Sequence, residues 1–215
     1  METVRLARAA GIGLGLLLTA AAGTAAASDV PRFGSVDVYY TASAKLDVAP
    51  DDDSGNGFGA RLMAPVTDDV LVTAEYGSSN YDDSDIDLDQ LRFGLAGMGG
   101  DRLRGGLGAE FVKLAFEFDV FGTTQTLKQE GLHAYGRIEY DVNPRLSLYG
   151  QAGYQWLTRA DADLTGPEYL AGAVIGLGTS VGAFAEYRYS DLEDRSGDSL
   201  QLRDFHLGLR FVFGN

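Results

Sequence analysis

Apolar and polar residues alternate one by one along most of this chain. In residues 200–213, Leu207 and Leu209 fall on one face, whereas Asp204 and Arg210 fall on the other. Successive side chains of an extended strand leave opposite faces, so a period of two indicates strands rather than helices. Because the same period recurs along the chain, we expect an all-β protein.

Ten alternating segments can be distinguished. They cover or centre on residues 35–46, 57–64, 70–78, 91–95, 103–111, 132–140, 146–154, 169–177, 183–189 and 200–213. Two of them, 57–64 and 169–177, are weaker, so eight strands are the alternative count. Ten strands are favoured because removing one adjacent pair would disrupt the alternation of short turns and longer polar links between the strands. Residues 112–129 stay open, since their alternation could prolong the preceding strand well beyond a membrane.

Short turns and longer polar links follow one another in strict alternation. The short turns are 65–69, 98–101, 141–144 and 178–180, and the longer polar links are 47–56, 79–87, 158–167 and 190–199. Outer-membrane barrels have this arrangement, with short turns in the periplasm and longer loops outside. The predicted fold is therefore a transmembrane antiparallel up-and-down β-barrel. Its apolar face would contact lipid, and its polar face would line the lumen.

The N-terminal segment has the pattern of an export signal. Arg5 and Arg8 precede an uncharged, Ala- and Leu-rich run at 9–22, and alanines follow it. We predict a cleaved secretory signal at 1–27 and one outer-membrane barrel domain at 28–215. An uncleaved anchor is the alternative, but small residues at the end of the run favour cleavage. A soluble β-sandwich would also show alternation, and export together with its recurrence favours the barrel.

Composition narrows the chemistry. The chain has 31 Asp and Glu against 17 Lys and Arg, a formal net charge of -14, which disfavours binding to nucleic acid. It contains no cysteine, so disulfides, thiolate metal sites and thiol catalysis are excluded. Its 29 glycines and 11 tyrosines suit closely packed strands and aromatic rings at a lipid–water boundary.

The alternation places charged residues of both signs on the face predicted to line the lumen. These residues are Asp37, Lys45, Arg61, Glu75, Arg92, Arg104, Glu110, Arg137, Glu139, Glu186, Arg188, Asp204 and Arg210. An unpaired charge in a narrow barrel is costly, so we expect interlocking pairs of arginine and carboxylate. A barrel of about eight strands is filled by side chains, and about sixteen leave a channel. We therefore expect a narrow, mostly closed lumen.

Two C-terminal segments resemble a known group. Residues 183–191, Ala-Phe-Ala-Glu-Tyr-Arg-Tyr-Ser-Asp, resemble the penultimate strand of the small outer-membrane β-barrel proteins, the OmpA-like and opacity-type porin group. Residues 205–213 resemble their terminal strand, which ends in an aromatic residue. The resemblance implies a Gram-negative outer-membrane location and recognition by the barrel-assembly machinery. Here Gly214 and Asn215 follow the last Phe, which departs from that pattern.

Three functions are compatible with such a barrel. It could be a structural barrel that presents surface loops, a porin for ions or small solutes, or an outer-membrane hydrolase using His133 or His206. We favour the first, because no enzyme motif surrounds either histidine, and we expect no enzyme activity, cofactor or metal site. The expected partners are outer-membrane lipid and lipopolysaccharide, and we expect a monomer. Acidic residues at 51–53 and 82–89 could hold Ca²⁺ or Mg²⁺, although hydration alone also explains them.

Overall fold

The computed structural model describes residues 34–48, 51–82, 86–120, 122–158 and 163–213. Within these ranges the chain forms ten β-strands, which confirms the predicted count and removes the eight-strand alternative. The strands are β1 (Gly34–Val48), β2 (Asp51–Pro65), β3 (Val70–Tyr81), β4 (Ile86–Gly99), β5 (Leu103–Val120), β6 (Thr123–Asn143), β7 (Leu146–Thr158), β8 (Asp163–Gly176), β9 (Val181–Glu193) and β10 (Ser199–Phe213). The predicted signal segment, 1–27, lies outside the described residues.

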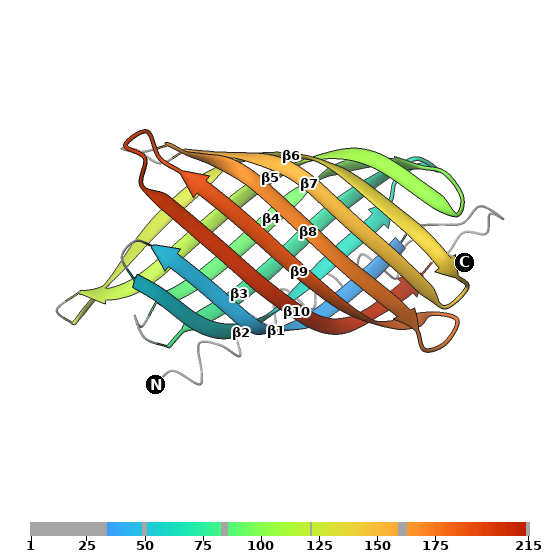
Figure 1. Ribbon diagram of the computed structural model, residues 1–215, viewed down its shortest axis with the longest axis horizontal. Coiled ribbons are helices and arrows are strands. Elements are labelled where there is room, and N and C mark those ends of the chain that lie inside the picture. The colour runs from blue at the N-terminus through green and yellow to red at the C-terminus, as the bar shows by residue number, and fades with distance from the viewer. Residues whose placement is uncertain (1–33, 49–50, 83–85, 121, 159–162, 214–215) are drawn as a thin grey trace.

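Each strand pairs antiparallel with its neighbours in the chain, and β1 pairs with β10 to close the barrel (Figure 1). The closing pair runs from Gly34 opposite Phe213 to Val48 opposite Leu200. Closure gives every strand a partner on both sides, so backbone N–H and C=O groups are bonded without water. Among the described residues there is no helix with the length and apolarity needed to cross a membrane.

The middle of the barrel has an apolar outer surface. Large side chains that point outward there are strongly exposed, among them Leu107 at 76% and Ile138 at 63%. Further members are Phe93, Leu95, Leu132, Ile175, Leu207, Leu209 and Phe211. Water-soluble monomers rarely expose so large a continuous apolar surface. This outer surface therefore fits hydrocarbon, as the alternation predicted.

The polarity of the two faces reverses toward the end of the barrel that lies away from Gly34 and Phe213. On β5, Phe111 points outward and is exposed, whereas Leu114 and Phe116, a few residues further on, point inward and are buried. Lys113 and Glu117 take the outward positions on that stretch. The strand thus passes from a region that is apolar outside to one that is apolar inside. Such a change is expected where a barrel leaves lipid and enters water.

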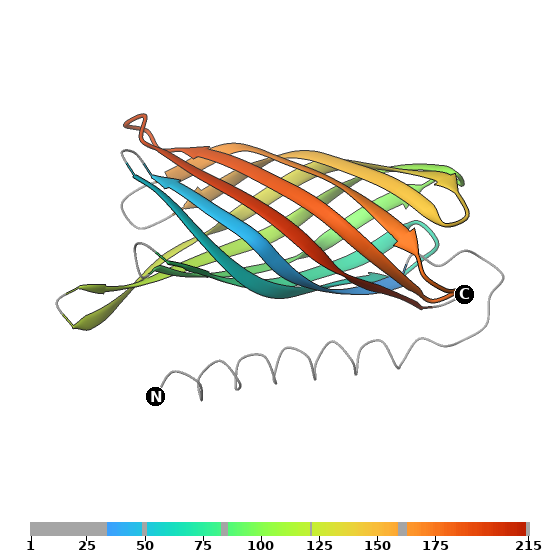
Figure 2. The ribbon, with the colours of Figure 1, turned by 60° about the horizontal axis from the view of Figure 1, so that its bottom comes forward.

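This reversal corrects the predicted strand ends. Most of the polar segments expected as long loops, at 47–56, 79–87, 158–167 and 190–199, are continuous with the strands. β5 and β6 are the longest, at 18 and 21 residues, and their hairpin extends beyond the neighbouring strand ends (Figure 2). In these segments the outward-facing side chains become polar, although the backbone continues as a β-strand.

A β-bulge in β1 corrects the predicted position of Lys45. The register shifts between Thr41 and Ala44, so Ala44 and the following Leu46 point inward and are buried. Lys45 then points outward opposite Arg203 and is exposed, and its prediction as a lumen residue is wrong. A bulge places one extra residue on one strand, which exchanges the two faces beyond it.

Local turn chemistry explains where strands reverse at the end that carries Gly34 and Phe213. Between β6 and β7, the Asn143 side chain accepts a hydrogen bond from the backbone N–H of Arg145, across a proline that cannot donate. Between β4 and β5, Gly100 has φ of 110°, a conformation that favours glycine. Tight links at this end match the periplasmic side of outer-membrane barrels.

Candidate functional site

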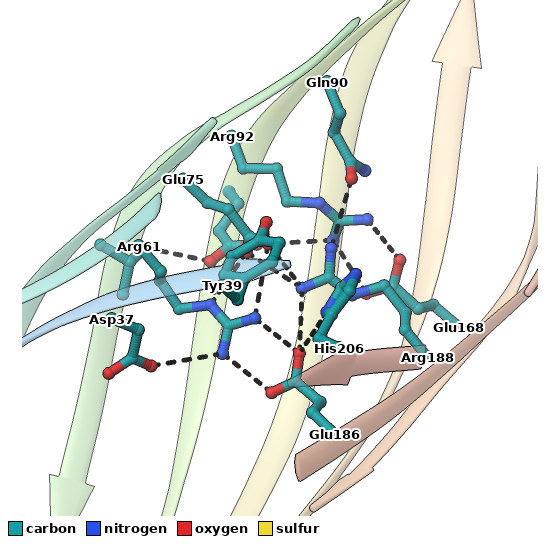
Figure 3. A network of polar contacts seen from close by, with 12 residues as sticks. Asp37, Tyr39, Arg61, Glu75, Gln90, Arg92, Glu168, Glu186, Arg188 and His206 are labelled. Carbon is teal, nitrogen blue, oxygen red and sulfur yellow. Dashed lines mark hydrogen bonds and ion pairs between the residues drawn. The ribbon is translucent and has the colours of Figure 1, made fainter. Parts of the chain in front are cut away.

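The interior of the barrel is the candidate site, because charged side chains from most strands converge there (Figure 3). Among the predicted lumen residues, the buried ones are Asp37, Arg61, Glu75, Arg92, Arg137, Glu186, Arg188 and Arg210. Half-buried ones are Arg104, Glu110, Glu139 and Asp204, and Lys45 lies outside. We call the buried and half-buried set, together with Glu168 and the two histidines, the central polar network.

Arg61 links three strands at the middle of this network. Its Nη1 and Nη2 donate to Glu186 at 2.9 and 2.6 Å, and its Nε donates to Glu75 at 3.0 Å. Arg188 donates from Nη2 to both oxygens of Glu75 at 3.0 Å. These charge-assisted hydrogen bonds satisfy the two carboxylates in a place where water is scarce.

A second group surrounds Glu168, which is not among the predicted lumen residues. Arg92 donates to both Glu168 oxygens, and Gln155 and Ser190 donate to Oε2 at 2.6 and 3.0 Å. Glu168 is buried at 1% exposure. A signal was present: it immediately precedes the lipid-facing Tyr169, so the alternation places it inward. It borders the polar link predicted at 158–167, so it does not stand out as part of the following strand.

Both histidines lie inside the network. His206 stacks on Tyr39 with ring centroids 4.4 Å apart, and its Nδ1 lies 3.2 Å from Glu186. His133 has no exposed surface, and its Nδ1 lies 3.5 Å from Glu110 Oε2. Each imidazole is therefore enclosed by carboxylates, rings and guanidinium groups of the chain itself.

A repeated Tyr–Gly–Glu arrangement holds two of the carboxylates. Tyr39 of β1 lies over Gly59 of β2 and donates to Glu75 of β3 at 2.7 Å. In the same way, Tyr149 of β7 lies over Gly172 of β8 and donates to Glu186 of β9 at 3.0 Å. A Cβ on Gly59 or Gly172 would come within 2.3 or 2.5 Å of the ring, so glycine makes room for each tyrosine.

Further pairs extend toward the end of the barrel that carries Gly34 and Phe213. Arg210 of β10 forms a bidentate salt bridge with Asp37 of β1, with both donor–acceptor distances at 2.8 Å. Arg104 pairs with Glu139 at 2.7 Å and with Asp141 at 2.9 Å. A cavity of about 30 Å³ beside the network is lined by Arg61, Glu75, Arg137 and Arg188, among others.

An apolar cluster fills the interior at the opposite end, away from Gly34 and Phe213. Its buried members are Ala44, Leu46, Tyr81, Leu88, Val112, Leu114, Phe116, Leu157, Leu192 and Leu202. They come from seven of the strands, β1, β3, β4, β5, β7, β9 and β10, and pack across the lumen. Partly buried Ile86, Leu127, Leu164 and Leu200 pack against them. We call this set the apolar cap; it was not predicted as an interior feature.

Metal chemistry receives no positive support from the described part of the chain. No group of three or more His, Asp or Glu side chains there is arranged to hold a metal ion. The acidic stretches at 51–53 and 82–89 fall partly outside the described residues. Their proposed Ca²⁺ or Mg²⁺ binding stays a prediction.

A closed antiparallel barrel with an apolar outer band and a polar centre defines a transmembrane barrel of the outer-membrane type. Comparison with protein families agrees. Residues 12–213 match the outer membrane protein beta-barrel domain, and the chain belongs to that family. The protein therefore resides in the outer membrane of a Gram-negative cell.

Solved structures show similar folds. An outer membrane channel from Pseudomonas putida F1 is 13% identical with a TM-score of 0.52, and the match covers 89% of this chain and 98% of that chain. The outer membrane protease OmpT from Escherichia coli is 10% identical with a TM-score of 0.50, covering 89% and 100%. Neisserial surface protein A is 14% identical with a TM-score of 0.45, covering 84% and 97%. A comparison with curated proteins found no match. At these identities, the likeness concerns the fold alone.

Proposed function

We propose that this protein is a structural outer-membrane barrel whose lumen is closed and whose strands raise hairpins above the cell surface. Two interior layers support closure. The central polar network occupies the membrane-level interior, and the apolar cap occupies the extracellular end. Ions crossing the lumen would have to separate buried charge pairs and then pass a dry apolar layer, and both steps are costly.

The apolar cap is the observation that carries this proposal. Water-filled barrels keep polar side chains along their lumen. Here Leu114, Leu157 and Leu192 are each at most 1% exposed in the interior. An interior lined with packed leucines offers neither water nor hydrogen-bond partners to a permeating solute.

Planar-bilayer recording of the refolded protein tests closure. We expect no stable conductance steps from the wild-type protein. A variant with Leu88, Leu114 and Phe116 replaced by serine should leak small ions more readily, provided it retains heat-dependent gel mobility. Stable single-channel steps from the folded wild-type protein would overturn the proposal in favour of a porin.

A narrow ion porin is the second candidate, favoured by the charged interior. In that case the buried arginines would form a pathway, and Arg188→Gln would change ion selectivity without reducing the amount of folded protein. In a closed barrel the same substitution changes stability instead. Selectivity measurements on any conducting preparation therefore separate the two functions.

The hydrolase hypothesis finds little support in the positions of the histidines. His133 and His206 are 0% and 3% exposed, so neither side chain is open to a substrate at the rim. Loss of a hydrolytic activity in a folded His133→Ala variant would reverse this conclusion.

Surface presentation is tested at the tip of the β5–β6 hairpin. Gly122 lies in this turn with φ of 78°, and the flanking strands hold the turn beyond their neighbours. An epitope inserted after Gly122 should be bound by antibody on intact cells. An epitope inserted at Gly100, in a periplasmic turn, should be bound only after the outer membrane is permeabilised. The opposite result would reverse the assumed orientation.

A further inference from the structure

The lipid-facing surface of the barrel carries a groove that crosses β6, β7, β8 and β9. Its floor consists of small residues, including Gly136, Gly150 and Ala152, and its volume is about 830 Å³. Tyr169 and Tyr187 stand beside this floor, each about half exposed. The groove opens to the surface that faces hydrocarbon, so an apolar chain fits it better than water does.

Basic side chains stand at the extracellular end of the groove. Arg203 lines the groove and lies over the ring of Tyr189 at 6.0 Å. The bulge in β1 places Lys45 directly opposite Arg203 on the same outer face. Arg203 also pairs with Asp47 at 2.5 Å, and Asp191 accepts a hydrogen bond from Tyr189 at 3.2 Å nearby. A phosphate would therefore compete with these two carboxylates for the basic pair. Both basic residues lie where the outer surface changes from apolar to polar, which is the level of lipid headgroups.

We propose that this groove binds one lipopolysaccharide molecule, with an acyl chain along the Gly and Ala floor and a phosphate on Arg203 and Lys45. The apolar floor suits the acyl chains of that lipid, and the basic side chains suit its phosphate groups. Arginine is suited to phosphate because its guanidinium group presents several donors in a fixed fork. The extracellular position of the basic pair selects the outer leaflet, whose lipid is a phosphorylated and multiply acylated glycolipid.

A second copy of this chain fits the same surface less well. Arg203 and Lys45 would face a surface that needs matching carboxylates at the same membrane level. A lipid binds there whether or not the lumen conducts, so this inference is independent of the proposed closure.

Native mass spectrometry of the protein purified from outer membranes tests the site, with lipid A as the added probe. We expect one bound lipid A to survive mild delipidation. Lys45→Gln combined with Arg203→Gln should weaken binding roughly 30-fold, because each basic side chain near an anionic lipid contributes about fivefold. Ala152→Phe should displace the lipid by filling the floor while leaving both charges in place.

Matched variants elsewhere on the outer surface provide the controls. Lys113→Gln with Lys128→Gln removes the same charge from β5 and β6, and Ala74→Phe adds the same bulk on β3. Both should bind lipid A like the wild-type protein, and all variants should keep heat-dependent gel mobility. Equal losses in the control variants, or undiminished binding in the groove variants, would overturn the proposal. Equal affinity for a phospholipid, or dimers that Ala152→Phe abolishes, would do so as well.

Discussion

Replacing Arg61 with methionine is the most direct test of the central polar network. Arg61 is buried and donates to both Glu75 and Glu186, and it lies 3.8 Å from Asp37. Methionine keeps much of the side-chain volume but removes the charge and every donor. Glu186 would then keep Tyr149 and His206 as neighbours without its two strongest hydrogen bonds.

The expected loss follows from the cost of an uncompensated buried charge. Removing one partner of a buried pair destabilises a protein by about 3–5 kcal/mol. We expect Arg61→Met to lower the free energy of unfolding by that amount. Adding Glu186→Gln should restore part of the loss, since the unpaired carboxylate is then removed. The single tryptophan, Trp156, points toward lipid, so its fluorescence can follow urea unfolding in lipid vesicles.

An exposed ion pair provides the control. Arg195 pairs with Asp163 at 2.5 Å, but the Arg195 side chain is 86% exposed. Surface pairs contribute about 0–1 kcal/mol, so Arg195→Met should change unfolding by no more than that. If Arg61→Met is as mild as Arg195→Met, the network does not stabilise the barrel as argued. If Glu186→Gln adds to the loss instead of restoring it, the pairing argument also fails.

Three further outcomes are expected from the same unfolding assay. Gly59→Ala should destabilise by about 1–3 kcal/mol, because its Cβ would meet the Tyr39 ring at 2.3 Å, and Tyr39→Leu should relieve most of that loss. Leu207→Arg, on the apolar outer band, should cost about 2–4 kcal/mol, whereas Ala115→Arg, on the polar outer surface beyond it, should cost at most about 1 kcal/mol. Leu114→Ala should cost about 2–5 kcal/mol by leaving a cavity in the apolar cap, more than Leu207→Ala on the lipid face. Similar costs for the two arginine variants would contradict the reversal of polarity, and similar costs for the two alanine variants would contradict a packed cap.

The architecture could be predicted because a strand in lipid has little freedom. Along β10, one face must satisfy hydrocarbon and the other the lumen, so the alternation from Asp204 to Phe211 is nearly unbroken. The number of strands and their antiparallel order followed from counting such segments between turns. The family match and the closed barrel agree with that prediction.

The strand ends could not be predicted from the same rule, because it assumes lipid outside throughout. Beyond Phe111, β5 continues with Leu114 inside and Lys113 outside, which appears as a loss of the lipid-facing pattern. The position of Lys45 failed for a different reason. An alternating pattern cannot reveal an extra residue when small residues such as Ala42 and Ser43 are acceptable on either face.

Partners across the lumen lie beyond any local pattern. Arg61 and Glu186 are 125 positions apart in the sequence, and their contact depends on closure and on the stagger between strands. The pattern predicts that arginines and carboxylates pair, but a local pattern cannot assign the partners. The hydrogen bonds from Tyr39 and Tyr149 were not expected either, although the glycines beneath them were noted as a compositional feature.

The pairing of β1 with β10 has a consequence for how this protein matures. Asp37 and Arg210, 173 positions apart, meet only where the first and last strands join, so the sheet stays an open ribbon until the final strand has been delivered. Contacts between such distant segments form slowly. A chain that stalls before Arg210 would leave the edges of β1 and of the last folded strand without hydrogen-bond partners. Pairing of β1 with β10 is therefore the step that completes the barrel.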